Sequence, residues 1–194
     1  MGTVLSARIL DAARDCVARV GVSKTTLDDV AREAGCSRAT LYRHFAGKGP
    51  LFEALIQRDL DRLDRRLAVA TADLVYLADV CAAVLTTGVE FVLDHAALTT
   101  VLAVEPTVLL SAVSFDGSEL FFARARALLA PHLWAHVGSD AERLAELLAR
   151  IAISHLSSPR TEAPISDPEV VQHLVRTYVV PGFVREPTSE RVQP

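Results

Sequence analysis

The chain has 194 residues, of which 51% are hydrophobic and 23% are charged, a composition that supports a substantial buried core and argues against disorder. The net charge of −4 does not by itself suggest a nucleic-acid partner, but it is unevenly divided. Residues 1–50 contain eight Lys or Arg and five Asp or Glu, whereas residues 51–194 contain twelve and nineteen. A basic head on an acidic body favours a phosphate-binding segment near the N-terminus and another role for the rest.

Cysteine usage and the N-terminal segment predict a cytoplasmic protein. The three cysteines are far apart and form no CxxC pair, which argues against a disulfide framework or a cysteine zinc site. Arg8, Asp11 and Arg14 interrupt the segment in which a secretory signal needs an apolar core. We therefore expect a reducing compartment.

Hydrophobic residues recur with helical spacing along the whole chain, and strand alternation is absent, so the sequence predicts an all-α fold. A first helix carries an apolar stripe over residues 9–20 and ends at Gly21. A threonine at 25 or 26 caps a second helix, which stops at residues 34–35. Ser37 caps a short third helix, and a fourth runs from about residue 50 to the late sixties.

The remaining pattern predicts longer helices. One covers residues 71–95. The apolar stretch 95–115 follows, with Glu105 and Pro106 at its centre, where we expect a break in the helix. A charge there costs about 2.5–3.5 kcal/mol on membrane-insertion scales, so we expect a buried helix and no membrane partner. Further helices begin at Ser118, at the capping box 139–142 and at residues 167–168, and the last ends near residue 180. The segment 185–194 is predicted to be a flexible tail.

Two short helices joined by a glycine-containing turn are typical of a helix-turn-helix. The second helix of that motif enters the major groove and reaches base edges with its first residues, here Arg38, Ala39 and Thr40. An arginine there can pair with guanine, and the alanine and threonine methyl groups can contact thymine. The spacing alone also fits an ordinary amphipathic surface helix.

Residues 25–51, TTLDDVAREAGCSRATLYRHFAGKGPL, closely resemble the DNA-binding signature of the TetR family. The matching elements are Thr25-Thr26, Val30-Ala31, Ala34-Gly35, Ser37, Thr40-Leu41-Tyr42, His44-Phe45, and Lys48 before Leu51. Gly49-Pro50 departs from the family pattern, which has an acidic residue after the lysine. A weaker resemblance to some members extends to the Glu-Pro at 105–106.

The resemblance implies a three-helix DNA-binding domain over residues 1–47 and a helical ligand-binding and dimerisation domain over residues 48–184, with the fourth helix as a lever. It implies phosphate contacts from Thr25, Thr26, Tyr42, His44 and Lys48. The full set of residues expected at the DNA is Lys24, Thr25, Thr26, Ser37, Arg38, Ala39, Thr40, Tyr42, Arg43, His44 and Lys48.

The second domain is predicted to hold a small apolar or amphipathic effector. The candidate ligand-binding residues are Tyr76, Phe91, Glu105, Phe121 and Trp134. Each has a structural alternative, because aromatic residues at helical spacing usually belong to the core and Glu105 can serve as a cap or ion-pair partner beside the proline. His132 and His136 have a metal spacing but no third ligand nearby, so we expect no metal and no cofactor. The sequence shows no convergent cluster of acid and base residues, so we do not expect an enzyme.

The last two helices carry wide apolar stripes. The resemblance favours a homodimer in which these helices form a four-helix bundle with their symmetry mates, and packing within one subunit is the alternative. The residues expected at this interface are Leu144, Leu147, Leu148, Ile151, Val170, Val171, Leu174 and Tyr178. The predicted function is a repressor that binds a palindromic operator in double-stranded DNA and is released by the effector. A DNA-binding regulator controlled by a protein partner is the alternative.

Overall fold

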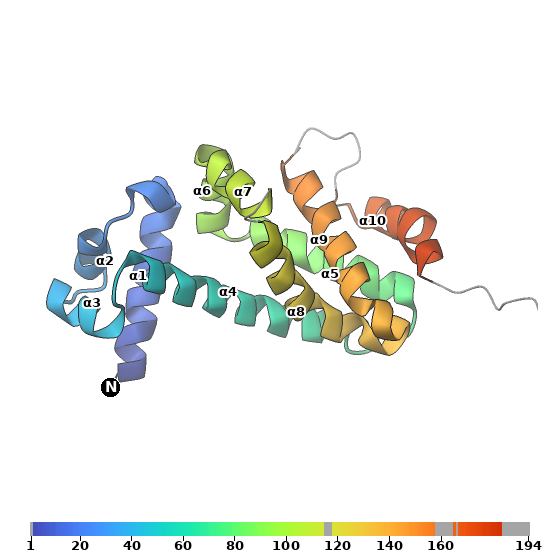
Figure 1. Cartoon of the computed structure of the whole chain (residues 1–194), viewed down its shortest axis with the longest axis horizontal. Helices are drawn as coiled ribbons and strands as arrows, with labels where there is room; N and C mark the ends of the chain where they lie inside the picture. Colours follow the sequence, from blue (N-terminus) through green and yellow to red (C-terminus); the bar gives the residue numbers. More distant parts are fainter. Residues whose placement is uncertain (1, 115–117, 158–164, 166, 184–194) are drawn as a thin grey trace, which may run out of the picture. The chain divides into compact units, whose positions relative to one another are not determined.

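The computed structural model describes residues 2–114, 118–157, 165 and 167–183, and every regular element in these ranges is helical (Figure 1). The all-α expectation is confirmed. The chain divides into two compact units. The first comprises residues 1–65 and 91–121, and the second comprises residues 66–90 and 122–194. These two units do not coincide with the DNA-binding domain expected over residues 1–47 and the ligand-binding domain expected over residues 48–184. The functional boundary at residue 47 stays a prediction.

The first unit begins with α1 (Gly2–Lys24), α2 (Leu27–Glu33) and α3 (Arg38–His44), and α4 (Lys48–Thr71) starts in it. Gly21 interrupts the helical backbone of α1 with φ 84° and ψ 173°, where the sequence predicts the helix end. The side chains of Thr26 and Ser37 accept hydrogen bonds from the Asp29 and Thr40 backbone N–H groups. Both predicted N-caps are therefore confirmed.

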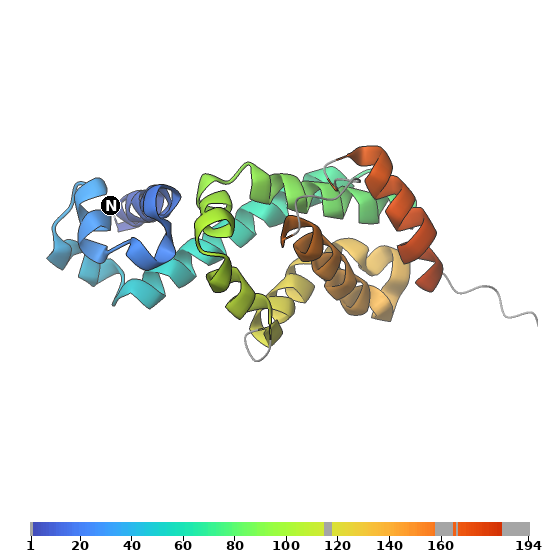
Figure 2. The same ribbon diagram turned by 90° about the horizontal axis from the view of Figure 1, so that it is seen from above.

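The apolar faces of these four helices form one buried cluster. Ile9 and Ala13 of α1, Val30 of α2, Leu41 of α3 and Leu51 of α4 are each fully buried in it. Figures 1 and 2 show α2 beside α1, and α3 packs against α2. The shared core fixes the orientation of α3, because its single buried residue is Leu41 and its other faces remain accessible.

The first unit also contains α6 (Ala96–Val104) and α7 (Pro106–Val113), and α6 packs along α1. The break expected at Glu105-Pro106 is confirmed, but the stretch is less buried than expected. Pro106 has no backbone N–H and begins a separate helix, and Val104 and Leu110 are more than half exposed. Among the described residues no single helix is long and apolar enough to cross a membrane. Together α6 and α7 reach that length and hydropathy, but across a bend of 96°.

The second unit contains most of α5 (Leu77–Leu93) and α8 (Ser118–Val137), followed by α9 (Ala141–Ser157) and α10 (Pro168–Leu174). The helix expected from residue 71 therefore starts at Leu77. Arg126 of α8 pairs with Glu146 of α9 at 2.6 Å, and Arg176, beyond α10, pairs with Asp79 of α5 at 3.2 Å. After α10 the chain continues through a π turn (Val175–Val179) and a 3-10 turn (Val180–Gly182). The predicted tail 185–194 lies outside the described residues.

Candidate nucleic-acid interface

The N-terminal residues of α3 present the side chains expected to contact bases. Arg38 and Ala39 are exposed and Thr40 is half-buried. The Arg38 Nη1 donates to Asp28 Oδ2 at 3.1 Å, and its guanidinium lies 5.5 Å from the centre of the Tyr42 ring. Hydrogen bonding to Tyr42 and attraction by Asp28 raise the pKa of Arg38, so the guanidinium stays charged. Arg38 is therefore already held at the protein surface by Asp28. To contact a base, its guanidinium must exchange this ion pair for hydrogen bonds to the base edge.

Cationic side chains lie on α3 and at the ends of α1 and α4. Arg43 is exposed on α3, and its Nη2 donates to the Thr40 Oγ1 at 3.3 Å. Lys48, the first residue of α4, donates from Nζ to the Ser23 carbonyl oxygen at 3.3 Å. Lys24 is exposed at the end of α1. These cations lie on helix ends next to the exposed face of α3, which suits contacts to the phosphate backbone.

Polar caps and aromatic residues complete the surface. Thr26 is exposed, and its Oγ1 donates to Asp29 Oδ2 at 2.5 Å. Ser37 and Thr40 share a hydrogen bond between their hydroxyl oxygens at 2.9 Å. His44 is half-buried, with its Nδ1 2.9 Å from the Ser6 Oγ. Tyr42 is 41% exposed, so its ring is available for a groove wall.

Thr25 does not fit the expected role. Its side chain is only 1% exposed, and its Oγ1 donates to the Gly21 carbonyl oxygen at 2.6 Å. The hydroxyl that the resemblance assigns to a phosphate therefore bridges α1 and the start of α2. Thr25 supports the turn between these helices, and the expectation of a phosphate contact from its side chain is corrected.

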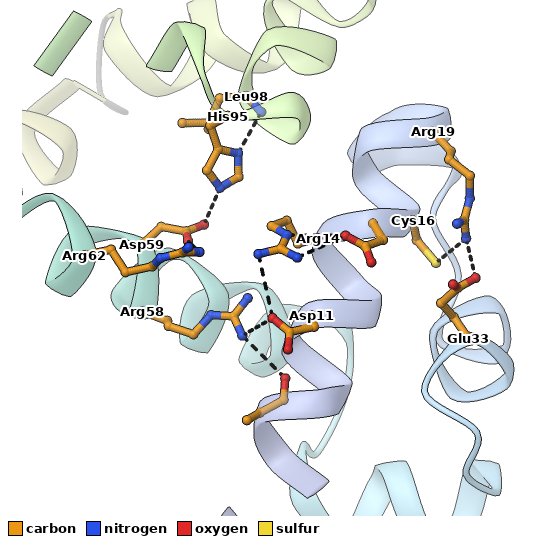
Figure 3. A network of polar contacts seen from close by, with 12 residues as sticks. Asp11, Arg14, Cys16, Arg19, Glu33, Arg58, Asp59, Arg62, His95 and Leu98 are labelled. Carbon is orange, nitrogen blue, oxygen red and sulfur yellow. Dashed lines mark hydrogen bonds and ion pairs between the residues drawn. The ribbon is translucent and has the colours of Figure 1, made fainter. Parts of the chain in front are cut away.

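A polar network behind this surface ties α1 and α2 to the first part of α4 and to α6 (Figure 3). Arg58 of α4 donates to Asp11 Oδ1 of α1 at 2.9 Å, and Arg19 of α1 pairs with Glu33 of α2 at 2.6 Å. The His95 side chain caps α6 by accepting a hydrogen bond at Nδ1 from the Leu98 N–H, and its Nε2 lies 3.2 Å from Asp59 Oδ2 on α4. Because Nδ1 accepts, the ring proton belongs on Nε2, facing the carboxylate.

The candidate ligand-binding residues fall in different surroundings. Phe91 is buried beside the His95 ring, at 5.8 Å between ring centroids. Phe121 is half-buried, whereas Tyr76 and Trp134 are 72% and 61% exposed. The Glu105 carboxylate accepts hydrogen bonds from the Val22 and Ser23 backbone N–H groups at 2.7 and 3.0 Å. Glu105 occupies the cap position between α6 and α7, but its side chain caps neither helix and binds the backbone of α1 instead.

The late helices separate into buried and accessible faces. Leu144, Leu148 and Val171 are at most 1% exposed within a single chain. These three belong to the core of the second unit, so their expected place in the subunit interface is corrected. Leu147, Ile151, Val170 and Leu174 are only partly buried, and Tyr178 is 74% exposed. Apolar groups are therefore present on both sides of these helices.

Sequence reasoning missed the partners of the interface residues. Asp28, in the first turn of α2, pairs with Arg38 ten residues later. Helical periodicity gives no sign of such a contact, since it joins two helices across a turn. The link between Glu105 and Val22 spans 83 residues, and the only sequence signals for it are a lone acidic residue in an apolar stretch and a glycine at a helix end. Among the described residues, no group of three His, Cys, Asp or Glu side chains could hold a metal ion.

Two short, capped helices on a common core, with an arginine-bearing second helix exposed and cations at its flanks, define a helix-turn-helix DNA-binding protein. Residues 9–55 match the family described as bacterial regulatory proteins, tetR family. The HTH-type transcriptional regulator AlkX of Mycobacterium tuberculosis is 32% identical over 177 residues, which cover 87% of this chain and 80% of the relative. The chain belongs to the TetR family of transcriptional regulators.

Other relatives match over shorter segments. An uncharacterised HTH-type transcriptional regulator of M. tuberculosis is 38% identical over 91 residues, so the chain spans less than half, 45%, of that relative's length.

The crystal structure of the TetR family repressor AlkX from a Dietzia strain superposes with a TM-score of 0.67 at 21% identity, covering 92% of this chain and 98% of that one. FadR from Bacillus subtilis, in complex with stearoyl-CoA, gives a TM-score of 0.68 at 14% identity over 88% and 97% of the two chains. These two structures share the fold of this chain.

Proposed function

We propose that this regulator is a homodimeric repressor that binds a palindromic operator and is released by a long-chain apolar or amphipathic effector. The observation that carries the DNA-binding part is the exposed N-terminal end of α3, where Arg38 stands among flanking cations. Arg38, Ala39 and Thr40 read the bases. Lys24, Arg43 and Lys48 contact phosphates, helped by polar groups from Thr26, Ser37, Tyr42 and His44.

A second copy of the chain is needed because a single α3 reads only one half-site. Two such helices must lie about 34–36 Å apart to enter successive major grooves on one side of the duplex. The accessible apolar groups of the late helices, Leu147, Ile151, Val170, Leu174 and Tyr178, fit an interface with a symmetry mate. We assign these five residues to a four-helix bundle.

The effector class follows from the helices that carry almost no charge. Neither α6 nor α7 contains a charged residue, and α5 contains only Asp79 and Glu90. Helices of this composition suit contacts to a hydrocarbon chain better than contacts to a highly charged ligand. Two proteins of similar fold support the same class: the Dietzia AlkX is implicated in n-alkane biodegradation, and the B. subtilis FadR was crystallised with stearoyl-CoA. Phe91 and Phe121 stay candidate ligand contacts. Tyr76 and Trp134 are mostly exposed, which makes them weaker candidates.

Release requires that the effector bind a conformation that does not fit the operator. The helix α4 begins at Lys48 in the DNA-binding surface and continues unbroken to Thr71, about 36 Å at 1.5 Å per residue. A tilt of about 10° at one end would displace the other by about 6 Å, enough to spoil the fit of α3 in the groove. Reciprocity requires that operator DNA weaken effector binding by the same factor.

The test uses a labelled operator fragment selected from random DNA with the wild-type protein. Stearoyl-CoA, stearate and hexadecane are titrated into the complex, and fluorescence anisotropy measures DNA release. A compound that stabilises the free protein against heat and releases DNA supports the proposal. If a compound binds but leaves operator affinity unchanged at saturation, the effector part is wrong and regulation by a protein partner is favoured. Leu147→Glu and Leu174→Glu test the dimer, because sedimentation of both variants as wild type would place the interface elsewhere.

A further inference from the structure

The corner between α6 and α7 binds the backbone at the end of α1 through Glu105. One carboxylate oxygen, Oε2, accepts the Val22 N–H at 2.7 Å, and the other, Oε1, accepts the Ser23 N–H at 3.0 Å. Nearby, Thr100 of α6 donates from Oγ1 to the Ala18 carbonyl oxygen at 2.8 Å. Two consecutive N–H groups aimed at one carboxylate form an anion-binding backbone concavity, here filled by a side chain of the same protein.

Gly21 makes this arrangement possible. Its backbone lies at φ 84° and ψ 173°, a region open to glycine and strained for other residues, and the turn directs the next two N–H groups toward Glu105. A Cβ atom at this position would lie 2.7 Å from the Glu105 Cδ and within 3.0 Å of both carboxylate oxygens. Glycine therefore provides both the conformation and the space that the carboxylate occupies.

The same turn supports the DNA-binding surface. Ser23 gives its N–H to Glu105 and its carbonyl oxygen to the Lys48 Nζ at 3.3 Å. The Gly21 carbonyl oxygen accepts the Thr25 hydroxyl, next to the cap of α2. Hydrogen bonds from Ser23 and Val22 and the nearby Lys48 ammonium lower the pKa of Glu105, so the carboxylate is ionised at neutral pH.

We propose that Glu105 is a positioning residue for DNA binding: its carboxylate fixes the turn 21–26 and with it the start of α2 and the Lys48 ammonium. The inference rests on the DNA-binding activity of the family and is independent of the effector. A purely electrostatic role predicts the opposite effect of removing the carboxylate, because a lost negative charge strengthens binding to DNA. The sign of the change therefore separates positioning from general charge.

The test compares Glu105→Gln with Glu90→Gln in the effector-free, full-length protein. Both variants lose one negative charge, and Glu90 is an exposed residue of α5. Anisotropy titrations with the selected operator are expected to show about tenfold weaker binding for Glu105→Gln, since the amide replaces one of the two acceptor oxygens by an NH2 donor that faces a backbone N–H. Glu90→Gln is expected to bind as tightly as wild type or slightly more tightly. The salt dependence should be unchanged in Glu105→Gln, because it keeps every phosphate-binding cation.

A second measurement tests the contact between Glu105 and the two backbone amides in the absence of DNA. Hydrogen exchange of the Val22 and Ser23 amides should be slow in the wild type and in Glu90→Gln, and faster in Glu105→Gln. Glu105→Asp keeps the charge but is one methylene too short to reach both amides, so it should also weaken operator binding and remains informative if the amide variant does not fold. Operator affinity of Glu105→Gln equal to that of Glu90→Gln, or unchanged exchange of both amides, would overturn the proposal.

Discussion

Replacing Gly21 by alanine is expected to destabilise the protein for two separable reasons. A non-glycine residue at φ 84° and ψ 173° carries a strain of about 1–3 kcal/mol. The added Cβ would also lie 2.7 Å from the Glu105 Cδ, so the carboxylate must swing away from the Val22 and Ser23 amides. For a chain of this length the strain alone lowers the melting temperature by about 2–12 °C.

A double-mutant cycle separates the two effects. In a Glu105→Ala background the carboxylate is already gone, so Gly21→Ala should cost only the backbone strain and the two changes should be less than additive. Thermal unfolding followed by circular dichroism measures all four proteins. Gly88→Ala in α5 is the control for the chemical change itself, because no atom beyond its chain neighbours and the local helix backbone lies within 4 Å of the added Cβ. In a helix interior that substitution should stabilise by about 0.5–1 kcal/mol.

The cycle can fail in two ways. An equal cost of Gly21→Ala with and without the Glu105 side chain would mean that the carboxylate does not pack against this glycine in solution. A stabilising Gly21→Ala, like that expected of Gly88→Ala, would mean that residue 21 is helical and that the end of α1 is misassigned. Either result would refute the reasoning from the turn geometry.

Three further predictions concern DNA binding and pH. The three cations Lys24, Arg43 and Lys48, or six per dimer, give a slope of roughly −5 in log K against log salt, and Lys48→Ala should reduce it and weaken all sequences alike. Arg38→Ala should lower operator affinity about 5- to 150-fold and relax preference at one base pair per half-site, whereas uniform weakening on random DNA would make Arg38 a phosphate contact. Because the folded-state pKa of Glu105 lies below its ordinary 4.5, the carboxylate stabilises the fold above that pH and loses this effect as pH falls through the lowered pKa. Melting temperatures of wild type and Glu105→Gln should therefore differ at neutral pH and converge in acid, and a difference that persists there would contradict the assignment.

The local structure of the DNA-binding region was predictable from sequence because its signals act over a few residues. The cap at Ser37 and the helix end at Gly21 were placed correctly, since a cap needs only a side-chain oxygen and an N–H two or three positions along. For the second helix the sequence narrowed the cap to Thr25 or Thr26, and the structure selects Thr26. The exposure of Arg38 and the burial of Leu41 followed from helical spacing on a seven-residue helix.

What the sequence left undecided depends on which helix packs against which. Periodicity marks a face as apolar, but only the packing in the structure assigned Leu144 to the core of a unit and left Leu147 accessible. It likewise turned Thr25 from an expected DNA contact into a buried support of the turn. From the sequence, Glu105 is only a charged residue beside a proline. In the structure it binds the Val22 and Ser23 amides. These contacts join residues 82 or 83 positions apart, so tertiary packing sets them and local spacing does not reveal them.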